Sequence, residues 1–156
     1  MAIFLGQHFE VRLDDKSRIK LPAALLNKIP TGERNSFMVK MGFETHLYLY
    51  LMSEWLKIAE EIGKLNQYVK KNRDFIRIFY KYSSEVVLDK SGRLLLPKNL
   101  LEKAKIEKDI VLFAHDNLVE IWDRNIYNTI VDDESVDPAE LAESVMGKIN
   151  NITPDD

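Results

Sequence analysis

The sequence predicts an α+β protein made of two tandem, β-rich units, with connecting helices between them and a helix at the C-terminus. Three observations predict this class: an internal repeat, short stretches of alternating apolar and polar residues, and longer stretches with apolar residues at helical spacing. The repeat matters most, because a repeated unit decides the architecture. Residues 13–28 match residues 88–103 without a gap, and the identical pairs are Leu13/Leu88, Asp14/Asp89, Arg18/Arg93, Leu21/Leu96, Pro22/Pro97, Leu25/Leu100, Leu26/Leu101 and Lys28/Lys103.

The first copy of the repeat contains the elements of a small β-rich unit. Residues His8 to Leu13 alternate in the way of a half-buried strand. Asp14 to Ser17 has the composition of a turn, and the alternation resumes at Ile19 and Leu21, so a hairpin is expected. Pro22 ends the second strand and opens a short helix that reaches Ile29. Two further strands are expected at Ser36–Met41 and His46–Leu51.

Helical spacing predicts the connection between the two copies. Ser53 is the expected N-cap of a longer helix. Its apolar residues form one stripe, made of Trp55, Ile58, Ala59, Ile62, Leu65 and Val69. Lys70-Lys71-Asn72 interrupts this pattern, and helical spacing resumes from Asp74 to Tyr82. We place the end of the first unit in this connection, so that the first unit covers residues 1–72.

The second copy follows the same plan over residues 73–131. Strands are expected at Glu85–Leu88 and Leu94–Leu96, and Pro97 starts a helix that runs to about Lys105. The later elements are a hairpin of Asp109–Phe113 with Leu118–Trp122 and a short amphipathic helix at Asn125–Val131. Residues 132–156 form an acidic tail, in which Asp137 caps a last helix from Pro138 to about Ile149 and the end is frayed.

Charge is distributed unevenly along the chain. The 156 residues carry a net charge of −3 and no cysteine, which excludes a disulfide scaffold and a thiol nucleophile. Eight acidic residues and one lysine lie between Asp132 and Asp156, so this segment carries −7 and residues 1–131 carry +4. This asymmetry favours an anionic partner for the main body. Neither a signal peptide nor an apolar run long enough for a membrane span is recognisable, so we expect a cytoplasmic protein without membrane contact.

Motifs of the common enzyme classes are missing from the sequence. It contains no glycine-rich phosphate loop, dinucleotide fingerprint or nucleophile elbow, and no cofactor is expected. His8, His46 and His115 each lack a second ligand at metal spacing, so strand or turn positions are favoured over a metal site. Asp14 and Asp15 are adjacent, and adjacent side chains on an extended chain point apart, which argues against a catalytic carboxylate pair.

The repeated turn with an aspartate, three residues and an arginine carries the functional prediction. A purely structural role is possible for one copy, because an aspartate can cap a turn and pair with an arginine. Two copies in equivalent places favour DNA recognition, since an arginine at a hairpin tip can hold guanine O6 and N7 in the major groove. The aspartate would orient the arginine, and nearby lysines would contact phosphates. The candidate DNA-binding residues are Asp14, Lys16, Arg18, Lys20, Asp89, Lys90, Arg93 and Lys98.

From Phe4-Leu5-Gly6 through both repeats to Glu120-Ile121-Trp122-Asp123, the chain resembles the MraZ family of bacterial transcriptional regulators. The resemblance implies two tandem SpoVT-AbrB domains of the swapped-hairpin, double-psi-like type, assembled into rings of eight or more subunits. It also implies a nucleoid-associated protein that binds repeated motifs in double-stranded DNA upstream of the division and cell-wall gene cluster, usually as a repressor. The DNA-contacting motif of the family falls on Asp14 with Arg18 and on Asp89 with Arg93.

One residue departs from the family pattern, which has a glycine just before the arginine. The second copy has Gly92 there, whereas the first has Ser17. If the turn needs a positive φ, serine costs energy that glycine does not, and Arg18 is then a less secure base reader than Arg93. Two other classes stay open at this point. One is an AbrB-like antitoxin or protein-interaction module, and the other is a hydrolase built on the carboxylates.

Overall fold

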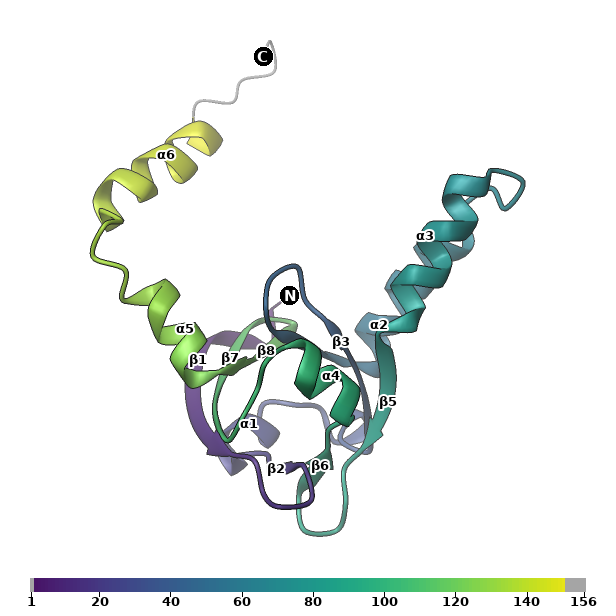
Figure 1. Ribbon diagram of the computed structural model, residues 1–156, viewed down its shortest axis with the longest axis horizontal. Coiled ribbons are helices and arrows are strands. Elements are labelled where there is room, and N and C mark those ends of the chain that lie inside the picture. The colour runs from purple at the N-terminus through teal and green to yellow at the C-terminus, as the bar shows by residue number, and fades with distance from the viewer. Residues whose placement is uncertain (1, 151–156) are drawn as a thin grey trace.

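A computed structural model describes residues 2–150 and has the predicted α+β class with two repeated halves (Figure 1). Its strands are β1 (Phe4–Arg12), β2 (Arg18–Lys20), β3 (Ser36–Met41), β4 (Leu47–Leu51), β5 (Ser83–Val87), β6 (Arg93–Leu95), β7 (Asp109–Asp116) and β8 (Leu118–Asp123). Its helices are α1 (Ala23–Leu26), α2 (Met52–Gly63), α3 (Lys70–Lys81), α4 (Lys98–Lys103), α5 (Arg124–Val131) and α6 (Pro138–Asn150), with a 3₁₀ turn at Thr31–Glu33.

The two repeats share one antiparallel sheet of six strands in the order β1-β7-β8-β4-β3-β5, and β2 pairs with β6 in a separate ribbon. The strand order is symmetric. Exchanging each strand of one repeat for its equivalent in the other (β1 for β5, β2 for β6, β3 for β7, β4 for β8) gives the same order read from the opposite edge of the sheet. The first strand of each repeat pairs with the third strand of the other, and β4 meets β8 at the centre. The halves are therefore interleaved about a pseudo-twofold axis.

The hairpin predicted from residues 8–13 and 19–21 is wrong, because β1 pairs with β7 and β2 pairs with β6. The connecting loop closes on itself, since the Asp14 N–H donates to the Arg18 carbonyl over 2.9 Å. Beyond the loop the two strands separate, and the Leu13 N–H donates to the carbonyl of Lys108 over 2.8 Å. Each repeat thus gives its second strand to a ribbon with the other repeat.

One apolar core holds equivalent residues of both repeats. Ile19 and Leu94 are register partners in the β2–β6 ribbon, and both side chains are fully buried. The equivalent pairs Leu21/Leu96 and Leu25/Leu100 lie in the same core. Burying such a side chain contributes about 1.5–3 kcal/mol, so each repeat relies on the apolar surface of the other. The unit boundaries at residues 72 and 131 stay predictions.

The connection between the repeats differs from its prediction in two places. The helix α2 begins at Met52 with Leu51 as its N-cap, and Ser53 instead donates its N–H to Glu33 Oε1 over 3.0 Å, so the predicted Ser53 cap is wrong. The predicted interruption at Lys70 is the start of α3, whereas α2 already ends at Gly63. Side chains of α3 stabilise the turn between the helices, because Arg73 Nη1 donates to the carbonyl of Gln67 over 2.7 Å.

The remaining elements follow the prediction closely, although α1 ends at Leu26, three residues early. The strands β7 and β8 form the expected hairpin, and α5 covers nearly the predicted range. The helix α6 starts at Pro138, and the Ala139 N–H donates to Asp137 Oδ1 over 3.0 Å. The predicted frayed end falls on residues 151–156, outside the described part of the chain. No helix within residues 2–150 is long and apolar enough to span a membrane.

Candidate nucleic-acid interface

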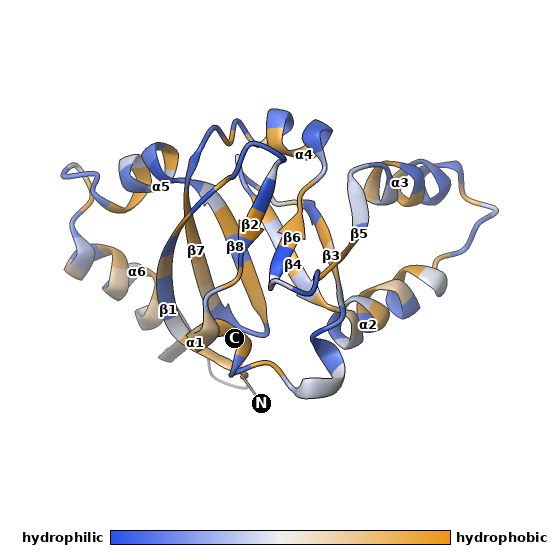
Figure 2. Cartoon of the chain, turned by 90° about the horizontal axis from the view of Figure 1, so that it is seen from below, coloured by the Kyte–Doolittle hydropathy of each residue, from blue (hydrophilic) through white to orange (hydrophobic). Residues whose placement is uncertain are grey.

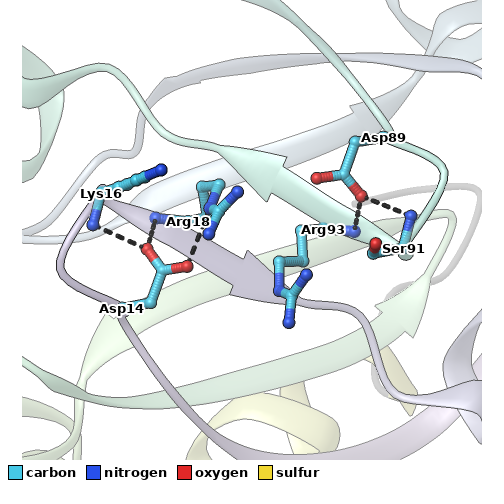
Figure 3. A network of polar contacts seen from close by, with 6 residues as sticks. All are labelled: Asp14, Lys16, Arg18, Asp89, Ser91 and Arg93. Atoms are coloured by element: carbon cyan, nitrogen blue, oxygen red, sulfur yellow. Dashed lines mark hydrogen bonds and ion pairs between the residues drawn. The ribbon is translucent and has the colours of Figure 1, made fainter.

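Both predicted arginine loops lie next to each other at one end of the molecule, on either side of the β2–β6 ribbon (Figures 1 and 3). The ribbon pairs Arg18 with Leu95, Ile19 with Leu94, and Lys20 with Arg93. Because side chains alternate along a strand, the buried Ile19 and Leu94 fix the opposite face as the outer one. That outer face carries Arg18, Lys20, Arg93 and Leu95.

In the first loop the Asp14 carboxylate organises both the backbone and the arginine. Asp14 Oδ1 accepts hydrogen bonds from the backbone N–H groups of Lys16 and Arg18, each 2.9 Å long. Asp14 Oδ2 accepts a bond of 2.8 Å from Arg18 Nε. The backbone bond from Arg18 is the main cause that lowers the pKa of Asp14, so this carboxylate is ionised at neutral pH. Arg18 is therefore anchored to Asp14 through both its backbone N–H and its Nε.

The second loop repeats the backbone arrangement without the side-chain pair. Asp89 Oδ1 accepts from the backbone N–H groups of Ser91 and Arg93 over 2.8 and 2.9 Å. The backbone bond from Arg93 is again the main cause that lowers the pKa of Asp89, and the charge of Arg18 contributes as well. Within the described residues the Arg93 guanidinium forms no hydrogen bond or ion pair. Figure 3 shows this side chain extended over the ribbon.

Both loops need a positive φ at the residue before the arginine. Gly92 has a φ of 78° and Ser17 has a φ of 62°, so serine adopts the left-handed conformation that glycine takes in the other copy. For an L-residue this conformation costs about 1–2 kcal/mol. The first loop nevertheless keeps the same backbone bonds, from position 16 and from Arg18 to the aspartate. Ser17 thus makes the first loop costlier and leaves its shape intact.

The four predicted lysines surround the ribbon. Lys16 and Lys90 are exposed in the loops, and Lys20 is exposed on the ribbon opposite Arg93. Lys98 is the first residue of α4, and it lines a cavity of about 280 Å³ together with Ser17 and Leu95. All eight predicted residues are therefore brought to one end of the molecule, where Figure 2 shows the ribbon face-on.

Leu95 is the outer-face residue that the sequence reasoning did not single out. Its side chain is 58% exposed, and it occupies the position in β6 that Lys20 occupies in β2. The alternation of Arg93, the buried Leu94 and Leu95 was the signal that could have identified it. An exposed leucine between arginines is suited to an apolar contact, such as the methyl group of thymine.

The rest of the described chain gives little support for another kind of site, such as a metal site. The three histidines take strand or strand-flanking positions, as predicted. His8 stacks on Phe113 at a centroid distance of 4.6 Å, and His46 stacks on Trp122 at 4.2 Å. Burial lowers the pKa of His46, which is 1% exposed. No group of three or more metal-binding side chains comes together within residues 2–150.

The acidic helix α6 lies at the other end of the molecule from the arginine loops (Figure 1). The fold and the site together define a class: a duplicated α+β protein whose interleaved repeats present two arginine loops on one β-ribbon.

Comparison with known proteins identifies the family within this class. The family model described as "MraZ protein, putative antitoxin-like" matches residues 4–78 and again residues 79–146. The chain is 41% identical to the transcriptional regulator MraZ of Flavobacterium psychrophilum, over 92% of each chain. It is 42% identical to that of Christiangramia forsetii, over 89% of this chain and 90% of the relative. The chain belongs to the MraZ family, a family of transcriptional regulators and not of enzymes.

Proposed function

We propose that the protein is a sequence-specific DNA-binding regulator that reads the major groove with the outer face of the β2–β6 ribbon. One observation carries the proposal: the ribbon presents Arg18, Lys20 and Arg93 on one face, flanked by two loops of the same backbone conformation. A two-stranded ribbon fits the B-DNA major groove, and arginine is the side chain best suited to hold guanine O6 and N7. The exposed lysines around it supply phosphate contacts, which add affinity without reading sequence.

The operator consists of repeated short motifs, and a ring of eight or more subunits binds them together. The body of residues 1–131 is only weakly basic, at +4. One subunit with this charge gains little from phosphate neutralisation alone. Linked subunits raise the effective concentration of each further loop at its motif, so affinity increases without any new contact. The resemblance to the family suggests repression of the division and cell-wall gene cluster by a cytoplasmic, nucleoid-associated protein.

The test is binding to the DNA upstream of the protein's own gene. Arg18→Ala and Arg93→Ala together are expected to abolish specific binding, because each engaged arginine contributes roughly 1–3 kcal/mol of base discrimination. Arg12→Ala is the control, since Arg12 is an arginine outside the ribbon, with a side chain 70% exposed that pairs with Asp109. Specific binding by the double variant at the parent's affinity would rule out the ribbon as the reading surface.

A second candidate is an antitoxin-like protein-interaction module, which the description of the matching family model favours. This function predicts a protein partner that co-purifies with the full chain at a fixed stoichiometry. The Arg18→Ala and Arg93→Ala double variant separates the two functions, because it removes DNA binding and leaves a protein partner bound elsewhere.

A further inference from the structure

The two halves of the molecule differ at one cavity beside the β2–β6 ribbon. This cavity of about 280 Å³ lies between β5, β6 and the start of α4. The first arginine loop closes one side of it, because the Leu96 N–H donates to the carbonyl of Ser17 over 2.9 Å. The residues that line the cavity are Ser17, Ser84, Glu85, Val86, Leu95, Leu96, Pro97 and Lys98.

The internal repeat gives each lining residue an equivalent in the other half. Four positions are identical in both halves: Glu85/Glu10, Val86/Val11, Leu96/Leu21 and Pro97/Pro22. The other four differ: Ser84/Phe9, Ser17/Gly92, Lys98/Ala23 and Leu95/Lys20. In the first half Phe9 packs against the apolar core, whereas the smaller Ser84 lines the cavity. The differences therefore add two hydroxyl groups and one ammonium group around an open space.

Lys98 brings a positive charge that no carboxylate of the described residues neutralises, because it forms no ion pair there. Glu85 is near, but side chains alternate along β5, so Glu85 points away from the face that carries Ser84 and Val86. The Ser84 hydroxyl makes only a long bond of 3.4 Å to the carbonyl of Glu85. An ammonium beside the hydroxyls of Ser84 and Ser17 is suited to hold a carboxylate.

The rest of the cavity is apolar. Its apolar lining residues are Val86, Leu95, Leu96 and Pro97. Leu95 is 58% exposed, so a ligand in the cavity can cover an apolar side chain that its own chain leaves open. The volume is slightly below the roughly 300–1,000 Å³ of sites for drug-sized molecules. The lining therefore matches a small molecule with one carboxylate and a short apolar chain.

We propose that this cavity binds a small carboxylate with a branched apolar chain, and that the bound ligand lowers the affinity of the protein for its operator. Lys98 cannot neutralise a DNA phosphate while it holds the carboxylate. The ligand also covers Leu95 on the outer face of the ribbon and lies against Ser17, the neighbour of Arg18. The effect on DNA rests on the proposed function, whereas binding of the ligand does not.

Binding is tested by calorimetry on the full chain without DNA, with 4-methylpentanoate as the probe. Acetate keeps the charge and lacks the chain, and 4-methylpentanamide keeps the chain and lacks the charge. Each should bind roughly tenfold more weakly or worse, because each loses one of the two kinds of contact. No binding of 4-methylpentanoate at millimolar concentration would overturn the site. Equal binding of acetate or of the amide would overturn the class of ligand.

Variants locate the ligand in the cavity. Ser84→Phe introduces the residue of the first half and should abolish binding, whereas Ser84→Ala keeps the space and should retain it. Lys98→Met should weaken binding roughly tenfold or more, since a charged hydrogen bond is lost. Lys28→Met is its control, because Lys28 is an exposed lysine that does not line the cavity. Binding of 4-methylpentanoate by Lys98→Met at the parent's affinity would overturn the site even if Ser84→Phe failed to fold.

The effect on DNA is measured by operator titration at several salt concentrations, with and without saturating 4-methylpentanoate. The ligand should weaken binding by the parent several-fold and reduce the slope of log affinity against log salt by about 0.9, the value for one phosphate contact. Ser84→Phe should bind the operator like the parent and ignore the ligand, which also corrects for the salt that the ligand adds. A bound ligand that leaves operator affinity unchanged would overturn the regulatory role.

The two proposals fail in different ways. A parent that binds 4-methylpentanoate and does not recognise its operator contradicts DNA reading and leaves the cavity site standing. A parent that recognises its operator and does not bind 4-methylpentanoate contradicts the cavity site alone.

Discussion

The two arginine loops have the same backbone and different side-chain order. In each loop the aspartate Oδ1 accepts two backbone N–H bonds, and the residue before the arginine has a positive φ. Arg18 is also fixed by a 2.8 Å bond from its Nε to Asp14, whereas Arg93 has no such bond to Asp89. The loop with the unfavourable residue, Ser17, therefore holds the better ordered arginine. A duplicated motif can thus keep one backbone conformation while its two copies order their arginines differently.

The largest expected effect is the difference between the two arginines themselves. Arg18→Ala and Arg93→Ala should each weaken operator binding by roughly 1–3 kcal/mol if each holds one guanine. Arg18→Ala should cost more, because ordering a free arginine on binding consumes about 0.5–1.5 kcal/mol, and Arg18 is already ordered. Titration of each variant against the same operator measures both values. A larger loss for Arg93→Ala would mean that the pair with Asp14 holds Arg18 back from the DNA.

Removing the aspartate charge should make the two loops alike. In Asp14→Asn the side-chain oxygen still accepts the two backbone bonds, but the ion pair with Arg18 is lost, so operator affinity should fall several-fold. Asp89→Asn is the matched change in the other loop and should leave affinity nearly unaltered, because Arg93 is not paired. Equal losses in both variants would indicate that Arg93 also pairs with its aspartate once DNA is bound.

The residue before the arginine gives a smaller, stability-based comparison. Ser17→Gly should stabilise the fold by about 0.5–1 kcal/mol, because relief of the left-handed serine exceeds the extra entropy of glycine in the unfolded chain. Gly92→Ser should destabilise it by a similar amount, with no steric contribution, since a Cβ at Gly92 meets nothing within 4 Å. Urea unfolding at an unchanged m-value measures both changes.

Gly32→Ser provides the control for these two variants. Its site is also open, and its φ does not lie in the left-handed range, so serine should be tolerated without loss. A stabilising Gly92→Ser would contradict the conformation described for the second loop.

The outer face of the ribbon differs at one more equivalent pair, Lys20 and Leu95. If Lys20 neutralises a phosphate, Lys20→Leu should reduce the slope of log affinity against log salt by about 0.9. Leu95→Lys gives the second half the charge of the first, and it should increase that slope by about the same amount while removing an apolar contact. Operator DNA with deoxyuridine in place of thymidine lacks the methyl group and therefore tests that contact. This change in the DNA should weaken operator binding by the parent more than operator binding by Leu95→Lys.

Local sequence patterns were sufficient for the elements and insufficient for their partners. The alternation of Ile19 and Leu21 identified the buried face of β2, and both short strands lie where they were expected. The pairing of β2 with β6, which brings both loops to one end, had no signal in the sequence. The same alternation suggested a hairpin, because nothing in residues 8–21 reveals that β1 finds its partner about a hundred residues away in β7. Ser53 was misassigned for a related reason: its N–H is taken by Glu33, a tertiary contact outside the helix.

The smallest expected effect concerns acid pH and again separates the two loops. The pKa values of Asp14 and Asp89 are both lowered, chiefly by the backbone N–H of the arginine, so the folded loops bind protons less readily than the unfolded chain does. The contribution of the two carboxylates to the stability of the fold is therefore complete above the unfolded pKa of about 3.9. It disappears as the pH falls through the lower pKa values of the folded state. Between pH 8 and 5 loop order should not change.

The side-chain bond from Arg18 lowers the pKa of Asp14 further, and Asp89 has no equivalent bond, so Asp89 should be protonated first as acid is added. Residue-specific NMR titration of the two carboxyl carbons measures this order. The same measurement distinguishes protonation of the two loop carboxylates from the effect of His46. The pKa of His46 is lowered, so the whole fold becomes less stable once the pH falls below about 6.5, because the unfolded chain then binds a proton that the buried ring does not. If Asp14 were protonated before Asp89, the bond between Asp14 and Arg18 would not persist in solution, and the two arginines would be equally free.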